Sequence, residues 1–240
     1  MERPLTNALS LLGREALRIV LPAWCVVCDS ELPWKERTAS CCRACWSSLP
    51  RIASAKCPSC AQPLAGGDGA MCIRCQVDPL PLEWCEAWGH YRGGLEKLLH
   101  AFKFERHDFL DEALAALLAE ALPDARFDAV VPVPMSPRKR RRRGYNQAEL
   151  LARVLGARID VPCQLLLTQP LERATQSHLA REERAANVRH AFIASARAGG
   201  KSLLIVDDVC TTGETLRACA RALKRAGATR LCAIAVAKAS

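Results

Sequence analysis

The stretch Leu203–Thr215, which reads LLIVDDVCTTGET, constrains the fold more than any other part of the chain. Its four leading apolar residues are typical of a strand buried on both faces of a sheet. Two adjacent carboxylates, Asp207 and Asp208, follow the strand, and a turn rich in threonine leads into a helix predicted from 215 to 227. Strands followed by helices build parallel α/β sheets, and these sheets bind ligands where their strands end.

Each part of this stretch suits a different piece of a sugar phosphate. Free N–H groups at the start of a helix bind phosphate, and Gly213 lets the backbone approach it closely. Asp207 and Asp208 would repel a phosphate, but they suit the hydroxyl donors of a ribose or a hydrated magnesium ion. A simpler interpretation is a buried strand with an acidic helix cap, because Asp is a common capping residue.

The stretch resembles the signature with which type I phosphoribosyltransferases bind 5-phosphoribosyl 1-diphosphate (PRPP). The resemblance implies that the acidic pair Asp207 and Asp208 holds the ribose, supports catalysis and works with Mg²⁺. It implies that the turn holds the 5′-phosphate, with Glu214 contributing its backbone only. The implied PRPP-binding residues are Asp207, Asp208, Thr211, Thr212, Gly213, Glu214 and Thr215.

Cysteine is the second distinctive feature, because four Cys-x-x-Cys pairs fall within about fifty residues. Two residues between cysteines place both sulfurs on one tight turn, and two such turns complete a tetrahedral zinc site. Consecutive pairs are the simplest assignment; an interleaved arrangement, Cys41 in place of Cys42, or reduced structural cysteines are the alternatives. The predicted ligands of one or two structural zinc ions are Cys25, Cys28, Cys42, Cys45, Cys57, Cys60, Cys72 and Cys75.

Composition divides the chain into two modules. Ten of 14 cysteines lie in the first 85 residues and all five tryptophans in the first 88, so we predict a helix and double zinc ribbon over 1–88 and a phosphoribosyltransferase-like domain over 89–240. No apolar run reaches the length of a membrane span, and the start lacks the features of a secretory signal, so a cytoplasmic location is predicted. The net charge of +9 favours phosphate-bearing partners.

Hydrophobic periodicity predicts strands that alternate with helices, and hence an α/β fold with a mostly parallel sheet flanked by helices. The predicted strands are 85–92, 128–133, 164–167, 202–206 and 230–236. The predicted helices are 5–20, 94–122 with a break near 104–108, 147–156 and 215–227. A loop bounded by prolines is predicted after the strand 128–133.

Six consecutive basic residues, 138–143, lie on the connection between that strand and the next helix. A charge run is usually a solvated loop, but this one is placed where ligands bind, and arginine forks suit diphosphate or nucleic-acid oxygens. Tyr145 is a candidate for stacking on a base. The polar stretch 173–190 is predicted to form a hood over the crevice, with a solvated helix as the alternative.

Together these segments resemble the ComF family, and the resemblance spans nearly the whole chain. Besides the cysteine pairs and the PRPP stretch, it rests on the segments Phe102–Phe104, Pro132–Pro134, Arg142–Gln147, Arg173 with Thr175–Gln176, and Arg184 with Asn187. It implies a cytoplasmic bacterial protein that helps to take up or use external DNA. The residues it implies for contact with diphosphate or nucleic acid are Lys103, Arg142, Arg143, Asn146 and Arg184.

Three functions follow as hypotheses. The chain could be an enzyme that transfers phosphoribose from Mg-PRPP with loss of pyrophosphate. It could be a binding protein in DNA uptake that senses PRPP and holds single-stranded DNA for a helicase or import component. It could be a phosphoribosyltransferase of nucleotide salvage. We rank DNA uptake and utilisation first because of the family resemblance.

Overall fold

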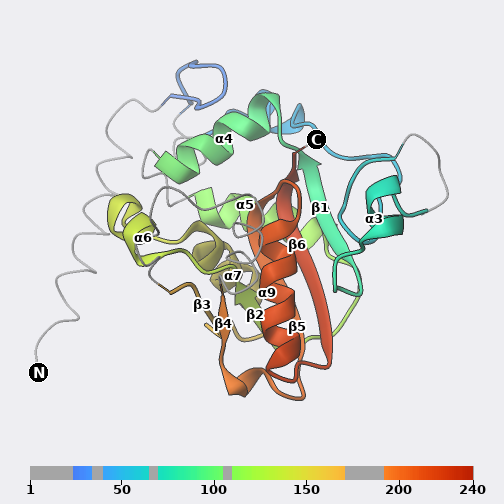
Figure 1. Ribbon diagram of the computed structural model, residues 1–240. Helices are drawn as coiled ribbons and strands as arrows, with labels where there is room; N and C mark the ends of the chain where they lie inside the picture. The colour runs from blue at the N-terminus through green and yellow to red at the C-terminus, as the bar shows by residue number, and fades with distance from the viewer. Residues whose placement is uncertain (1–23, 34–39, 65–69, 105–109, 171–191, 240) are drawn as a thin grey trace, which may run out of the picture.

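The computed structural model describes residues 24–33, 40–64, 70–104, 110–170 and 192–239. Within them a four-stranded parallel sheet has the order β1 (Cys85–His90), β6 (Arg230–Lys238), β5 (Ser202–Cys210), β2 (Ala129–Pro132) (Figure 1). The central strands β5 and β6 are buried along most of their length, as their apolar sequences predict. A parallel sheet flanked by helices is therefore confirmed.

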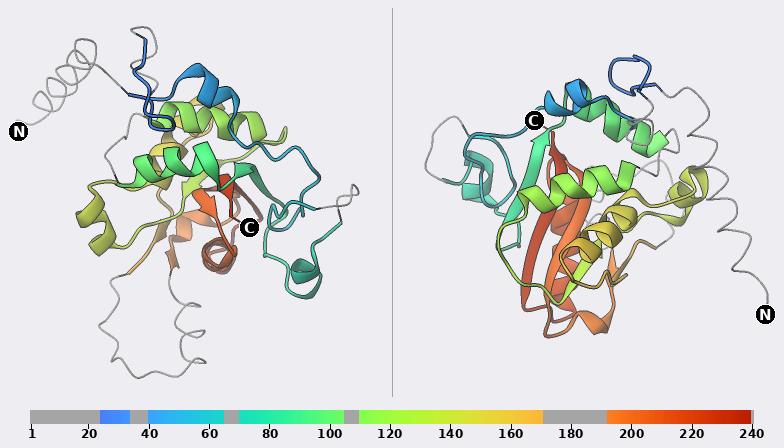
Figure 2. Two further views of the ribbon diagram at one scale, coloured as in Figure 1. Left: turned by 90° about the horizontal axis from the view of Figure 1, so that it is seen from above. Right: turned by 180° about the vertical axis from the view of Figure 1, so that it is seen from behind.

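Helices cover both faces of the sheet, because alternate residues of each strand point to opposite faces. Leu203 and Ile205 of β5 face α9 (Glu214–Arg225), whereas Leu204 and Val206 face α5 (Asp111–Ala121) and α7 (Gln147–Arg158). Figure 1 shows α9 in front of the sheet, and the right-hand view of Figure 2, seen from behind, shows α5 and α7 on the opposite face. Each strand thus contributes to two apolar cores.

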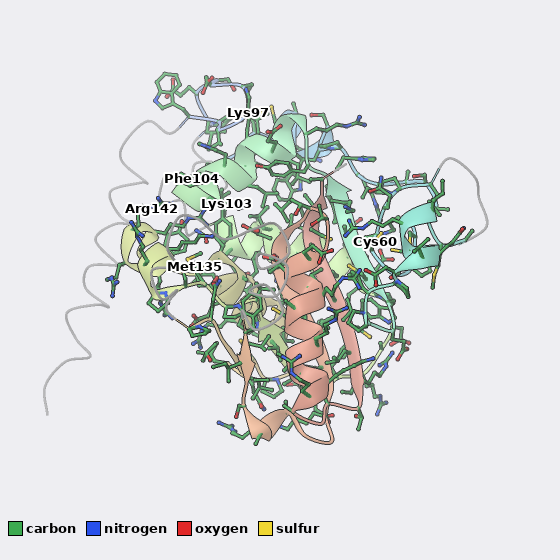
Figure 3. All side chains as sticks on the ribbon, viewed as in Figure 1. Cys60, Lys97, Lys103, Phe104, Met135 and Arg142 are labelled. Atoms are coloured by element: carbon green, nitrogen blue, oxygen red, sulfur yellow. The ribbon has the colours of Figure 1, made fainter. Side chains whose placement is uncertain are left out.

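The helix predicted over 94–122 is present as α4 (Gly93–Phe104) and α5, on either side of residues 105–109, which lie outside the described part. The buried residues of α4 share one core with those of α5 and α7, including Leu95, Leu98, Leu99 and Phe102. This packing places the end of α4, where Lys103 lies, beside the ends of the central strands (Figure 3).

The loop predicted after β2 is wrong in part, because the basic run forms the helix α6 (Pro137–Arg143). Its start has a serine cap, since Ser136 Oγ accepts a hydrogen bond from the Lys139 N–H at 3.4 Å, and Pro137 occupies the first helical position. Gly144 ends the helix in the left-handed conformation, with φ 89°. The local capping signals therefore outweigh the repulsion between neighbouring cations.

Strand boundaries differ from the prediction in two places. β5 continues to Cys210, past the predicted end at residue 206, because its ladder with β6 runs as far as the pair Cys210 and Lys238. The strand predicted over 164–167 is shifted, because β3 (Leu167–Thr168) pairs antiparallel with β4 (Ile193–Ala194). A 3₁₀ turn, η3 (Ala196–Ala198), connects β4 to β5.

Within its described residues, the cysteine-rich part has little regular structure beyond two one-turn helices, α2 (Arg43–Ser47) and α3 (Ile73–Val77). The predicted boundary at residue 88 falls inside β1, and we retain the two-module division as a proposal. The predicted helix 5–20 and the predicted hood 173–190 lie outside the described residues. None of the described helices combines the length and apolar character needed to cross a membrane.

Candidate functional site

The predicted PRPP stretch forms a strand, a turn and a helix, as its sequence indicates. β5 ends at Cys210, Gly213 takes the left-handed conformation with φ 83°, and α9 begins at Glu214. Gly213 is the N-cap and supplies no side chain to the first turn of α9. The Glu214 N–H donates to Thr212 Oγ1 at 3.5 Å, but Gly213 caps none of the N–H groups that follow, so these are available to a ligand.

A cavity of about 210 Å³ opens beside this turn. The acidic pair Asp207 and Asp208 lines it together with Thr215 from the first turn of α9. Cationic and amide side chains line the rest of the cavity: Lys103 from α4, Lys139 and Arg143 from α6, and Asn146, Gln147 and Gln169. The structure thus brings six of the predicted contact residues together, namely Lys103, Arg143, Asn146, Asp207, Asp208 and Thr215.

The two carboxylates have different surroundings. Lys103 Nζ lies 3.0 Å from an oxygen of Asp208, and both side chains are largely buried. Asp207 Oδ1 accepts a hydrogen bond from the Asp208 N–H at 2.9 Å. Burial, followed by the negative charge of Asp208, raises the pKa of Asp207 well above its ordinary value. Asp208 is therefore paired with the Lys103 cation, whereas the surroundings of Asp207 oppose its ionisation.

The segment Arg142–Gln147 is tied to the end of α4 and to β2 by hydrogen bonds. The Tyr145 hydroxyl donates to the Phe102 carbonyl, and Gln147 Nε2 donates to the Lys103 carbonyl at 3.3 Å. Asn146 is buried: Nδ2 donates to the Val133 carbonyl at 3.0 Å, and Oδ1 accepts from the Ala148 N–H at 3.2 Å, capping α7. These contacts give Tyr145 and Asn146 a positioning role that the sequence did not reveal.

The predicted arginines divide between the cavity and the surface. Arg143 lines the cavity, and its guanidinium carbon lies 4.7 Å from the centroid of the Phe104 ring. Arg142 is exposed on α6, next to the end of α4 in Figure 3. Arg184 lies outside the described residues. Phe104 has 53% of its surface exposed, so the aromatic ring open to solvent beside α6 is Phe104, whereas Tyr145 is only partly exposed.

The turn residues point in several directions. Thr211 and Thr212 are exposed, and the buried Lys238 donates a hydrogen bond to the Thr211 carbonyl. Glu214 pairs with Arg74 of the cysteine-rich part, with 2.6 Å between Nη2 and Oε1. The side chain of Glu214 therefore contacts the cysteine-rich part, and its role toward a ligand stays a prediction.

The eight predicted metal ligands form two sets. The sulfurs of Cys25, Cys28, Cys42 and Cys45 all lie within 4.8 Å of one another, as do those of Cys57, Cys60, Cys72 and Cys75. Four thiolates around one zinc ion at about 2.3 Å would be about 3.8 Å apart. The Cys28–Cys42 and Cys60–Cys72 sulfur separations of 3.9 and 3.7 Å fit this geometry.

The zinc sites therefore use consecutive pairs, and the interleaved alternative is wrong. Backbone N–H groups also point at the sulfurs: Cys42 N lies 3.3 Å from Cys25 Sγ, and Cys45 N lies 3.4 Å from Cys42 Sγ. Such contacts stabilise thiolates. Cys41 belongs to neither set, since its sulfur donates to the Cys42 carbonyl. A set of four cysteine ligands fits a closed, structural zinc site.

Comparison with known proteins supports both halves. Residues 16–76 match the family described as a double zinc ribbon domain, and residues 113–240 match the phosphoribosyl transferase domain. The chain is 33% identical over 221 residues to the DNA utilization protein YhgH of Salmonella typhi, covering 88% of this chain and 94% of that protein. It is 29% identical over 222 residues to the competence protein ComFC of Bacillus subtilis, covering 85% and 89%.

Among solved structures, the glutamine PRPP amidotransferase of Bacillus subtilis, in complex with ADP and GMP, matches with a TM-score of 0.39 and 23% identity. The match covers 52% of this chain and 25% of that chain. The two family matches and these relatives show that this chain belongs to the ComF family, and in this chain a double zinc ribbon domain precedes a phosphoribosyl transferase domain.

Proposed function

We propose that this protein binds Mg-PRPP in the crevice and acts in the cytoplasm in the uptake or use of external DNA. One observation carries the PRPP part: Asp207, Asp208 and Thr215 line the same cavity as Lys103 and Arg143. Sugar hydroxyls need acceptors, whereas a diphosphate needs cations, and this cavity offers both. The names of the relatives, DNA utilization protein and competence protein, support the biological role.

In the proposed complex, the first turn of α9 and the threonines hold the 5′-phosphate. The carboxylates of Asp207 and Asp208 hold the ribose hydroxyls and the Mg²⁺ ion, as expected for oxygen ligands. Lys103 and Arg143 face the diphosphate, and Nε of Arg143 is a buried atom that has no hydrogen-bond partner within the described part of the chain. A diphosphate oxygen would supply that partner.

A calorimetric titration with PRPP, with and without Mg²⁺, tests this proposal. Wild-type protein should bind PRPP in a magnesium-dependent manner, and Asp208→Ala should abolish the binding while leaving the zinc content unchanged. Asp124→Ala, at an exposed position away from the cavity, is the matched control and should bind as the wild type does. Absence of binding by the wild-type protein would refute the PRPP part.

The exposed arginines of α6 support the second part of the proposal, which is binding of single-stranded DNA. Phosphate contacts through lysine and arginine release counterions, so the affinity should fall steeply with salt. Replacing both Arg141 and Arg142 by Gln should weaken binding of an oligonucleotide and flatten its salt dependence. The double variant Arg221→Gln and Arg225→Gln removes the same charge from the exposed face of α9 and should change little. Equal losses in the two variants would remove α6 from the proposed interface.

The same crevice would also serve phosphoribosyl transfer, the activity of a salvage enzyme. Pyrophosphate release from Mg-PRPP in the presence of a panel of bases separates the two functions. Release that depends on Asp207 and Asp208 would establish turnover, whereas binding without release would assign a sensing role in which a helicase or import component reads the bound state.

A further inference from the structure

The second cysteine set lies against the phosphate turn. Leu80 follows this set along the chain, is 4% exposed, and packs in one small core with Cys57, Cys60 and Cys75. A Cβ atom added to Gly213 would lie 3.1 Å from Leu80 Cδ1, so the Leu80 side chain is in contact with the turn. The Leu80 N–H also donates to Ser59 Oγ at 2.8 Å, which ties Leu80 to the loop between Cys57 and Cys60.

Polar contacts join the same segment to the first turns of α9. Arg217 is 5% exposed, and its Nη1 donates to Asp78 Oδ1 at 2.9 Å and to the Pro79 carbonyl at 3.0 Å. Its Nη2 donates to the Asp78 carbonyl at 3.0 Å. The Arg74–Glu214 ion pair lies beside these bonds, although both of its side chains are about half exposed and it contributes little by itself. The buried fork of Arg217 is the stronger link.

The first cysteine set has different neighbours. Lys97 Nζ donates to the Val27 carbonyl at 2.7 Å, and a Cβ atom on Gly94 would lie 3.2 Å from Val27 Cγ1. Both contacts join the first set to the beginning of α4 rather than to the turn. The two metal sites therefore support different parts of the domain, and each provides a matched control for the other.

We propose that the second zinc site, Cys57, Cys60, Cys72 and Cys75, is a structural part of the phosphate site. A module this small has little core and depends on its metal to fold. The ion would hold the segment Asp78–Leu80 in place, and this segment contacts Gly213 through Leu80 and binds Arg217 through Asp78 and Pro79. Loss of this ion releases the turn and lowers affinity for PRPP, whereas loss of the first ion leaves the turn ordered. The affinity part of the inference rests on the proposed function; the order of the turn does not.

Two variants of the full-length protein test the inference, each lacking the last cysteine of one set. Cys75→Ser should lose one zinc ion, speed amide hydrogen exchange over 211–217 by about tenfold or more, and weaken PRPP binding by about tenfold or more. Cys45→Ser should also lose one zinc ion, but its faster exchange should appear over 24–33, over 40–49 and in α4. Unchanged exchange over 211–217 in Cys75→Ser would overturn the inference.

A second pair of variants leaves the metal ligands intact. Leu80→Ala and Arg217→Gln should keep both zinc ions and still speed exchange over 211–217, with PRPP affinity lower by about threefold or more in each. If Cys75→Ser does not fold, these two variants still test the inference. Exchange over 211–217 as slow as in the wild-type protein, in both variants, would contradict a link between the second zinc site and the turn. If the wild-type protein failed to bind PRPP, the proposed function would fail, while the exchange data would still decide whether the second zinc site orders the turn.

Discussion

Lys103 Nζ lies 3.0 Å from an Asp208 oxygen, joining the end of α4 to the end of β5 across the crevice. Both side chains are largely buried, so the pair is shielded from solvent and its loss leaves an uncompensated carboxylate. The contact connects two segments that the sequence separates by more than a hundred residues. It also places a cation beside the acidic pair before any ligand arrives.

Replacing Lys103 by Met should therefore weaken PRPP binding by about tenfold or more, equivalent to about 1.4 kcal/mol or more. Without the ammonium group, the two adjacent carboxylates repel the diphosphate more strongly, so the variant should need a higher Mg²⁺ concentration to reach half-maximal binding. Titrations at several Mg²⁺ concentrations measure this shift. Lys103→Arg keeps the charge and should recover part of the affinity; a variant with wild-type magnesium dependence would contradict the proposed role.

Asp207 makes the stability dependent on pH in a defined direction. Its pKa is raised in the folded state, chiefly by burial and then by Asp208, so the folded protein binds a proton more tightly than the unfolded chain does. The stability that comes from this group is present at low pH and is lost as the pH rises from the unfolded value toward the folded-state pKa.

Asp207→Asn should consequently raise the melting temperature, and the increase should grow as the pH rises from the ordinary aspartate pKa toward neutrality. The Asn side-chain oxygen can still accept the hydrogen bond from the Asp208 N–H. Asp124→Asn, at an exposed position, is the control for effects of pH on the zinc sites, and differential scanning calorimetry is the measurement. A larger increase at the lower pH would show that the raised pKa has been assigned the wrong direction.

Gly213→Ala should destabilise the protein by about 1–2 kcal/mol, because an alanine at φ 83° is strained and its Cβ would press on Leu80. The two causes can be separated in a double-mutant cycle. In a Leu80→Ala background the contact is relieved and only the backbone strain remains, so the cost of Gly213→Ala should fall. Urea unfolding provides the free energies; an equal cost in both backgrounds would exclude a steric contribution.

Asn146→Ala should cost about 2 kcal/mol of unfolding free energy, because it removes the cap of α7 and leaves the buried Val133 carbonyl without its side-chain donor. Tyr145→Phe removes a single hydroxyl and should cost about 1 kcal/mol. Urea unfolding with zinc content monitored in parallel checks both values. If Tyr145→Phe left stability unchanged but weakened oligonucleotide binding, Tyr145 would be a ligand contact rather than a positioning residue.

The parts of the site that could be predicted are those whose residues lie close together in the sequence. The strand, acidic pair and turn of Leu203–Thr215 lie next to one another in the sequence, and each Cys-x-x-Cys pair is a local turn. The helix α6 was missed although its signals, Ser136 and Pro137 at one end and Gly144 at the other, were local too. The six consecutive cationic residues between them favoured a solvated loop over a helix.

Other contacts could not be predicted because they join residues far apart in the sequence. Arg217 lies on α9 among apolar neighbours, and nothing around it indicates a partner at Asp78, 139 positions earlier. From the sequence, the ring of Tyr145 could stack on a base or its hydroxyl could bond to a carbonyl, and it is the packing of α4 in the same core as α7 that selects the Phe102 carbonyl. Hydrophobic periodicity reports which face of an element is buried, but not which residue meets it.

The strand β1 begins only ten residues after Cys75 and is hydrogen-bonded into the sheet beside β6. Because this connecting segment is short and its far end is hydrogen-bonded into the sheet, the second ribbon cannot move over the wide volume that a long flexible linker would allow. If the protein binds single-stranded DNA as proposed, the DNA meets cations held in fixed positions, and its association rate should depend on the electric field of those cations rather than on movement of the ribbon.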